Sequence, residues 1–218
     1  MVLFQGLRKL PNHIYLSIGI FLFIFVFPLI DRTSVFDFFG PLAYSIMSLS
    51  ILSIVEKKRK KTRPQFLYVL ISLSIVFLWL MYYFDYKIIR ILSFAFNIFV
   101  FSSATIIMIA QIVASKEVNS KVIIEVINGY LLIGVMFTLT NSLLFALNHN
   151  SFSMGNTELA NLVYYSFITL TTIGYGDILP MTGTAKMASI FFGLSGQLYL
   201  TIIVALIIGK FLNNNNSK

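Results

Sequence analysis

Residues 171–177, which read TTIGYGD, form a segment whose backbone could bind a cation. Gly174 and Gly176 permit backbone dihedrals that other residues avoid, and such dihedrals let successive carbonyl oxygens turn in one direction. A stack of carbonyl oxygens can replace the water shell of a dehydrated cation, and the Thr172 hydroxyl could add a further ring of ligands. Because one chain supplies only one wall of such a site, a closed ring of oxygens requires several copies around an axis.

The residues just before this segment predict a short helix that holds it. Residues 156–171 are too few, and too polar at their start, to cross a membrane. Asn156 or Thr157 can cap a helix, and Glu158 in the first turn suits the positive end of the helix dipole. We therefore expect a re-entrant helix over 157–170, with its negative C-terminal end directed at a cavity in which a cation waits.

The composition indicates a polytopic membrane protein. The chain has 218 residues, of which 58% are hydrophobic and 11% are charged, against about 45–50% and about 25% in a soluble domain. So little charge cannot cover a globule of this size, which nearly excludes a soluble enzyme, and the high hydrophobicity excludes disorder. The absence of cysteine excludes disulfides, thiolate metal sites and cysteine catalysis. We expect neither an enzyme activity nor a cofactor.

Six apolar segments are candidates to cross a hydrocarbon core, which takes about 20 residues. They are residues 13–30, 38–55, 65–84, 88–114, 122–147 and 182–212. The second is the weakest, because Ser and Tyr dilute it and Pro41 lies near its start. The first lacks a small-residue cleavage site, so we expect it to remain uncleaved.

Basic residues predict how these segments are oriented. Twelve of the sixteen Lys and Arg lie at the two ends of the chain and in the loops after the second and fourth segments, and the other four lie in the alternate loops. Because Lys and Arg accumulate on the cytoplasmic side, both termini are expected in the cytoplasm. The chain would then be a multi-pass protein of the cell membrane, plasma or inner, with residues 171–177 on the outer side.

The segment around residues 171–177 resembles the pore of tetrameric potassium channels. A half-helix precedes it and two apolar segments flank it, and the filter of that family is a four-fold ring of TVGYG loops. The resemblance covers roughly residues 122–212. The alternative is a Gly-rich extracellular turn that matches by chance.

This resemblance implies a homotetramer through which potassium passes. It assigns the selectivity filter to Thr172, Ile173, Gly174, Tyr175 and Gly176, with potassium bound at the first four. Ile173 stands where the family has Val, a mild departure because only its carbonyl faces the ion. Asp177 would lie at the outer mouth.

The resemblance also assigns residues that support the filter. Tyr164 and Tyr165 occupy the place of an aromatic pair that braces it from behind, and Thr171 begins the matching segment. The two phenols could hydrogen-bond toward Tyr175 or Asp177, or they could simply pack.

Two glycines are candidates for a gating hinge in the last apolar segment. Gly196 lies nineteen residues after Asp177, which is the family's spacing, and Gly193 is the second candidate. Close helix packing through small residues is the alternative.

Ile168 stands where some members hold a buried Glu, so filter closure that depends on that Glu is not expected.

Six segments with the pore last resemble the voltage-gated layout. This predicts a four-helix, voltage-sensor-like domain over 1–115, as in bacterial members, a cytoplasmic linker over 116–121 and a pore domain over 122–212. The fourth segment nevertheless carries only Lys87 and Arg90, both at its outer end. Each charge moved through the field yields about 2.3 kcal/mol per 100 mV, so two outer charges cannot supply steep voltage gating. We expect both to be interfacial anchors.

A basic cluster lies between the second and third segments and contributes much of the net charge of +8. It consists of Lys57, Lys58, Arg59, Lys60, Lys61 and Arg63. It could fix the topology, bind anionic lipid headgroups, or do both; nucleic-acid binding is not expected. Residues 213–218 read as a disordered, low-complexity tail, and we expect no ligand-binding domain after the last segment.

The sequence thus favours a potassium-selective channel that is not steeply voltage-gated. A weakly selective cation channel, or a subunit that needs another chain, would keep the same pore. A membrane transporter would need intramembrane carboxylates or histidines. Glu125 is the one such candidate, and His13 and His149 lie at opposite ends of their segments. This scarcity argues against the transporter.

Overall fold

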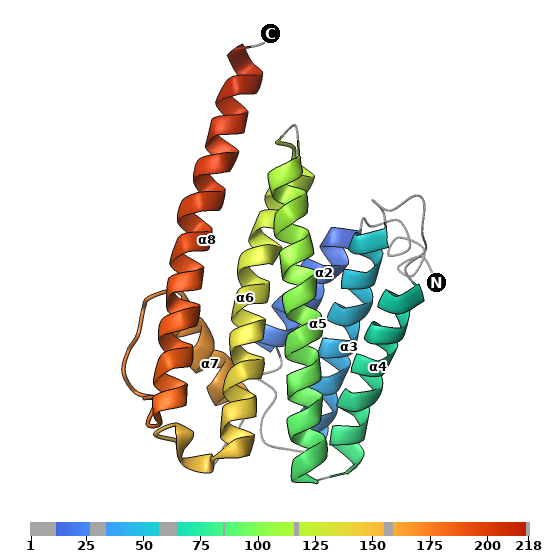
Figure 1. Cartoon of the computed structure of the whole chain (residues 1–218), viewed down its shortest axis with the longest axis vertical. Coiled ribbons are helices and arrows are strands. Elements are labelled where there is room, and N and C mark those ends of the chain that lie inside the picture. The colour runs from blue at the N-terminus through green and yellow to red at the C-terminus, as the bar shows by residue number, and fades with distance from the viewer. Residues whose placement is uncertain are drawn as a thin grey trace.

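The structure, a computed structural model, is a bundle of helices (Figure 1). It describes residues 12–26, 34–56, 65–84, 86–115, 118–154 and 159–216. The elements are α2 (Asn12–Phe21), the π-type turn η1 (Leu22–Val26), α3 (Ser34–Glu56), α4 (Gln65–Tyr83), α5 (Lys87–Ala114), α6 (Ser120–Leu147), the 3-10 turn η3 (His149–Ser151), α7 (Leu159–Leu170) and α8 (Gly183–Asn216). Within these ranges, the one extended pairing is an isolated bridge between Phe152 and Pro180. The predicted all-helical class is confirmed.

The helices coincide with the predicted apolar segments to within a few residues. Three of them, α5, α6 and α8, are long and apolar enough to cross a membrane by length and composition. The other apolar stretches in the described part of the chain are shorter. Helix α7 lies within the range 157–170 for which a re-entrant helix was predicted, and its re-entrant placement stays a prediction. Residues 155–158, with the cap expected at the start of this helix, lie outside the described residues.

The prediction of a disordered tail over 213–218 is wrong for most of that segment. Helix α8 continues to Asn216, and only the last two residues lie outside the described part of the chain. Extending an existing helix adds one hydrogen bond for each residue that is ordered, which is far easier than starting a new helix. Low-complexity sequence at the end of a long helix can therefore stay helical.

Two of the polar residues that dilute α3, Tyr44 and Ser48, face the interior of the bundle. Tyr44 is 3% exposed and Ser48 is fully buried, whereas the neighbouring Leu49 is 55% exposed. This pattern is the reverse of a water-soluble helix, and it suits a helix whose outer side meets lipid. Pro41 is accommodated inside the first turns of α3.

Helix α5 presents an uncharged face to its neighbours. Its buried residues are Ser93, Phe94, Asn97, Val100, Phe101, Ala104, Thr105, Met108 and Ile112. These positions recur every three or four residues, as gating charges would in a voltage sensor, yet all are apolar or neutral. The buried face of α5, which packs against the other helices, therefore carries no charged residue.

Two of the first four helices, α2 and α5, pack directly on α6, the helix that precedes the candidate site. α5 and α6 form the most extensive helix contact of the described chain, and α2 packs against both α3 and α6. The Lys87 ammonium donates a hydrogen bond to the Leu147 carbonyl at 3.3 Å, so the start of α5 meets the end of α6. Lys87, predicted only as an interfacial anchor, thus also caps a helix C-terminus.

A buried polar pair between α4 and α5 offers a test of this packing. The Ser74 hydroxyl donates to the Asn97 side-chain carbonyl at 2.6 Å, and the Asn97 amide donates to the Ser93 carbonyl at 2.9 Å. Ser74→Ala leaves a buried acceptor without this donor and should cost about 1–2 kcal/mol of unfolding free energy. Replacing both side chains, with Ser74→Ala and Asn97→Val, should cost less than the sum of the single changes. Thermal unfolding in detergent measures all three variants, and strictly additive losses would contradict the pairing.

Candidate functional site

The C-terminal end of α7 is tied to the start of residues 171–177 by main-chain hydrogen bonds. Four successive N–H groups donate to carbonyls in the last turns of α7. They run from Thr171 to Phe167 (2.9 Å), from Thr172 to Thr169 (3.1 Å), and from Ile173 and Gly174 to Ile168 (2.9 and 3.1 Å). A helix end leaves such carbonyls without partners, and here the segment itself supplies them. The predicted half-helix therefore carries the segment at its C-terminal end.

These bonds determine where the carbonyl oxygens of the segment point. No cis peptide bond occurs in the described residues, and in a trans peptide unit the C=O points opposite to the N–H. Because the N–H groups of Thr172, Ile173 and Gly174 face α7, the carbonyls of Thr171, Thr172 and Ile173 point away from it. Three successive main-chain oxygens therefore face away from the helix that holds them.

Every second residue from Thr172 to Gly176 has a positive φ angle, the backbone conformation that favours glycine. Gly174 and Gly176 have φ angles of +55° and +81°, as their residue type allows. Thr172 also has a positive φ, +62°, which is rare for a β-branched residue and which the sequence did not indicate. Strain of this kind gathers at functional sites, where the surroundings hold it in place.

Helix α6 holds α7 from one side through polar contacts in an otherwise apolar interface. The Tyr130 hydroxyl donates to the last carbonyl of α7 at 3.2 Å, and the Asn141 amide donates to the Ser166 hydroxyl at 2.9 Å, both residues of that pair being buried. At Gly134, a Cβ atom would collide with the ring of Phe167. Sequence reasoning missed these residues, although isolated polar side chains and a glycine within an apolar helix were the signal for them.

Tyr165 supports α7 from within the core. Its hydroxyl lies 2.6 Å from the Ser189 hydroxyl of α8. Its ring packs against Phe137 and Phe152, with ring centroids 5.9 and 5.2 Å away. Of the two possibilities left open for this residue, the structure has packing together with a hydrogen bond to α8.

Tyr164, the other member of the aromatic pair, faces the outer end of the segment. Its side chain is 37% exposed. A side-chain hydrogen bond to the Asp177 carboxylate raises the pKa of the Tyr164 phenol. This contact joins α7 to the residue predicted at the outer mouth.

A second main-chain connection holds the far end of the segment. The Ser153 N–H donates to the Leu179 carbonyl at 2.9 Å, and the Leu179 N–H donates back to the Ser153 hydroxyl at 2.8 Å. The Met181 N–H donates to the Ser151 carbonyl at 2.8 Å. Residues 171–177 are therefore fixed at both ends, by α7 at one and by the loop after α6 at the other. No sequence motif predicted this clamp between residues 151–153 and residues 179–181.

The two predicted hinge glycines have different surroundings within the continuous helix α8. A Cβ atom on Gly196 would come within 2.6 Å of a Leu170 methyl group and 3.2 Å of the Leu170 carbonyl oxygen. A Cβ atom on Gly193 would meet nothing within 4 Å. Gly196 therefore permits α8 to approach the end of α7 closely, which is the packing role left open for it. A hinge at either glycine stays a prediction.

A tyrosine one turn further along α8 fixes this helix to α6. The Tyr199 hydroxyl donates to the Val126 carbonyl at 2.8 Å, and a Cβ atom on Gly129 would collide with that hydroxyl. Tyr199 is only 6% exposed. No sequence pattern predicted this role of Tyr199.

In a single chain, the candidate site lies open on one side. Ile173 is 56% exposed and Tyr175 is 75% exposed. Along α8 the apolar residues that face outward are Met187, Ile190, Phe191, Leu194, Leu198 and Ile202, each more than half exposed. The predicted basic cluster at Lys57–Arg63 lies outside the described residues.

Comparison with known proteins finds similarity in the part of the chain that holds this site. Residues 130–213 match the model of the ion channel family. That region contains most of α6 together with α7, residues 171–177 and nearly all of α8. No solved structure matches the chain significantly.

Several curated proteins are similar over the same part of the chain. Two-pore potassium channel 2 of Arabidopsis thaliana is 35% identical over 81 residues, which are 37% of this chain and 18% of that protein. Potassium channel subfamily K member 17 of Homo sapiens is 47% identical over 47 residues, 22% of this chain and 14% of that protein. Two pore potassium channel c of Oryza sativa subsp. japonica is 44% identical over 54 residues, 24% of this chain and 12% of that protein. The chain thus spans less than a fifth of the length of these relatives.

The match to the family model falls in the part of the chain that contains α6, α7 and α8, two of which, α6 and α8, are long and apolar enough to cross a membrane by length and composition.

The unequal surroundings of the two glycines in α8 predict unequal effects of the same substitution. Gly193→Ala should stabilise the protein by up to about 1 kcal/mol, because Ala is the better helix former and its methyl group enters open space. Gly196→Ala should destabilise it, because the methyl group would press on Leu170 at the end of α7. Thermal unfolding of the two variants in detergent measures the difference. Equal effects would contradict the contact between α8 and α7.

Proposed function

We propose that this protein is a potassium-selective channel that conducts passively through a pore formed by four copies of the chain. The observation that carries the proposal is the set of carbonyl oxygens directed away from α7. It is supported by the positive φ angles at Gly174 and Gly176 and by the similarity of this region to potassium channels.

Potassium is the proposed permeant ion, held by main-chain oxygens at Thr172, Ile173, Gly174 and Tyr175. A ring of carbonyl dipoles replaces the ion's water shell and releases the ion again because successive sites are similar. The C-terminal end of α7 adds the negative end of a helix dipole near these oxygens. Asp177, in contact with Tyr164, would concentrate cations at the outer mouth.

Four copies are proposed because one chain leaves the site open. The exposed side chains of Ile173 and Tyr175 and the outward apolar face of α8 lie on surfaces that a single copy does not cover. A closed ring of ligands places equivalent surfaces of each copy around one axis. The remaining apolar surface would meet lipid.

The first four helices are proposed to form a voltage-sensor-like domain without a working sensor. Lys87 and Arg90 lie at the start of α5, and the buried face of that helix carries no charge. The distribution of Lys and Arg favours cytoplasmic termini in the cell membrane. Channel opening would then not depend steeply on voltage.

Purified protein in liposomes should carry a potassium flux far larger than its sodium flux. Gly174→Ala should reduce this flux at least about tenfold, because a side chain at a positive φ costs about 1–2 kcal/mol in every subunit. Ile173→Val is the matched control at the neighbouring position. It should keep both flux and selectivity, because only the main-chain carbonyl of this residue faces the ion. A fluorescent flux assay and reversal potentials in mixed potassium and sodium measure these quantities.

The possible failures of this experiment are distinct. Equal potassium and sodium fluxes would indicate a weakly selective cation channel. Flux that appears only with a second, different chain would indicate a non-autonomous subunit. A protein that is oligomeric and folded but gives no cation flux would contradict a channel function.

A further inference from the structure

A lysine near the inner end of α8 binds the end of α5. The Lys210 ammonium donates to the carbonyl oxygens of Val113 at 2.7 Å, Ser115 at 2.8 Å and Ile112 at 3.2 Å. An ammonium group has three N–H donors, so these three bonds use all of them. All three acceptors belong to the last turn of α5 and its C-cap.

The contact satisfies two groups that are otherwise costly at this place. The last carbonyls of a helix have no partners within the helix, and they form the negative end of its dipole. Lys210 lies near the end of the apolar stretch Gly183–Leu212, where a charge without a partner is unfavourable. Of the three acceptors, the Ile112 carbonyl also accepts from the Ser115 N–H at 3.2 Å and from the Ser115 hydroxyl at 2.7 Å. A cation at this end of α5 offsets the negative end of the helix dipole and gives the ammonium its partners. Lys210 was predicted only as one of the charges that orient the chain.

Lys210 continues the face by which α8 packs on the rest of its own chain. The buried residues of α8 are Ala185, Phe192, Gly196, Tyr199 and Ile203. Lys210 follows Ile203 by seven residues, which is two helical turns and therefore the same face. Between Ile203 and Lys210 the helix is mostly exposed, and the Lys210 ammonium makes the last hydrogen bonds among the described side chains of α8.

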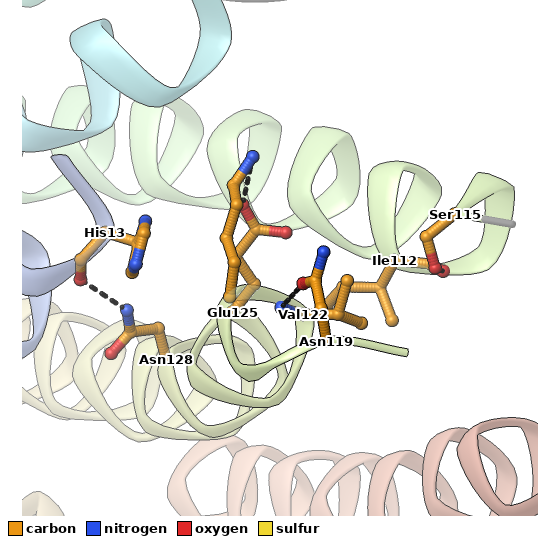
Figure 2. A network of polar contacts seen from close by, with 8 residues as sticks. His13, Ile112, Ser115, Asn119, Val122, Glu125 and Asn128 are labelled. Carbon is orange, nitrogen blue, oxygen red and sulfur yellow. Dashed lines mark hydrogen bonds and ion pairs between the residues drawn. The ribbon is translucent and has the colours of Figure 1, made fainter. Parts of the chain in front are cut away.

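The end of α5 is itself held close to the start of α6. Figure 2 shows Ile112 and Ser115 facing the first turns of α6, which carry Asn119 and Val122. The Asn119 side chain caps α6 by accepting from the Val122 N–H at 3.1 Å. The inner end of α8 is therefore joined to the point where the four-helix part passes into α6. In Figure 1, α8 leans toward this point, while the loop that contains residues 171–177 lies beside the other half of the helix.

We propose that Lys210 is a positioning residue that holds the inner end of α8 against α5 of its own chain and so keeps the inner mouth of the pore wide. The inference rests on the proposed channel function. Held toward its own four-helix part, the end of α8 is kept from converging with the ends of the other copies. Loss of the three hydrogen bonds frees it to converge and narrows the path.

The experiment compares four proteins: the natural chain, Lys210→Met, Lys210→Arg and Lys87→Met. Lys87→Met is the matched control, since Lys87 also caps a helix C-terminus, but at the opposite end of α5. Lys210→Met should lower potassium flux about tenfold, which is the scale of about one hydrogen bond to a charged group. Lys210→Arg keeps a cation with several donors and should stay close to the natural flux, as should Lys87→Met. Potassium-over-sodium selectivity should be the same in all four, because residues 171–177 are unchanged.

Hydrogen exchange supplies a measurement that does not depend on flux. Lys210→Met should speed amide exchange at the end of α5, and Lys87→Met should leave that region as it is. Natural flux in Lys210→Met overturns the proposal, even if exchange is faster, and so does a flux loss that Lys210→Arg does not rescue. If Lys210→Met does not assemble, Lys210→Ser, whose side chain is too short to reach α5, replaces it under the same criteria. Absence of flux from the natural chain would overturn the channel function and, with it, the role of Lys210. If the natural chain conducts and Lys210→Met conducts equally well, only the proposed role of Lys210 is overturned.

Discussion

The candidate site depends on which groups hydrogen-bond to the free carbonyls at the C-terminal end of α7. The Ile168 carbonyl accepts N–H groups from both Ile173 and Gly174, and the N–H groups of Thr171 and Thr172 bind the same last turns. Once these N–H groups face α7, trans peptide geometry directs the linked carbonyls the other way. Two of the oxygens proposed to hold the ion, those of Thr172 and Ile173, are thus oriented by the hydrogen bonds that complete the end of α7.

Most of the specific contacts among α6, α7 and α8 keep α7 in place. Tyr130, Asn141 and Gly134 hold it from α6, whereas Gly196 and Ser189 hold it from α8. These small and polar residues allow close approach and hydrogen bonding where apolar side chains give little preference over lipid. The open side of the segment and the exposed face of α8 are what a ring of copies would cover. The contact of Lys210 with α5 extends the same principle, because there too a helix end receives its missing partners from another helix.

The sequence predicted the helices well because long apolar runs separated by charges leave few alternatives. It also identified residues 171–177, since Gly at alternate positions is a local signal. It did not predict the left-handed Thr172, because a β-branched residue gives no signal for a positive φ. It also did not predict the clamp between Ser153 and Leu179, which joins residues 26 positions apart in the chain. The helical end at Asn213–Asn216 was missed because composition says nothing about a helix that simply continues. Lys210 could be counted as a charge, but its partners are main-chain carbonyls, which no sequence pattern displays.

The most direct test of the proposed pore is a density map of the purified oligomer in potassium. We expect four copies around one axis, residues 171–177 lining that axis, and ion density at the level of the Thr172–Tyr175 carbonyls. Replacing potassium with sodium should weaken or rearrange that density. An assembly in which residues 171–177 face lipid or lie apart from a common axis would contradict the proposed pore.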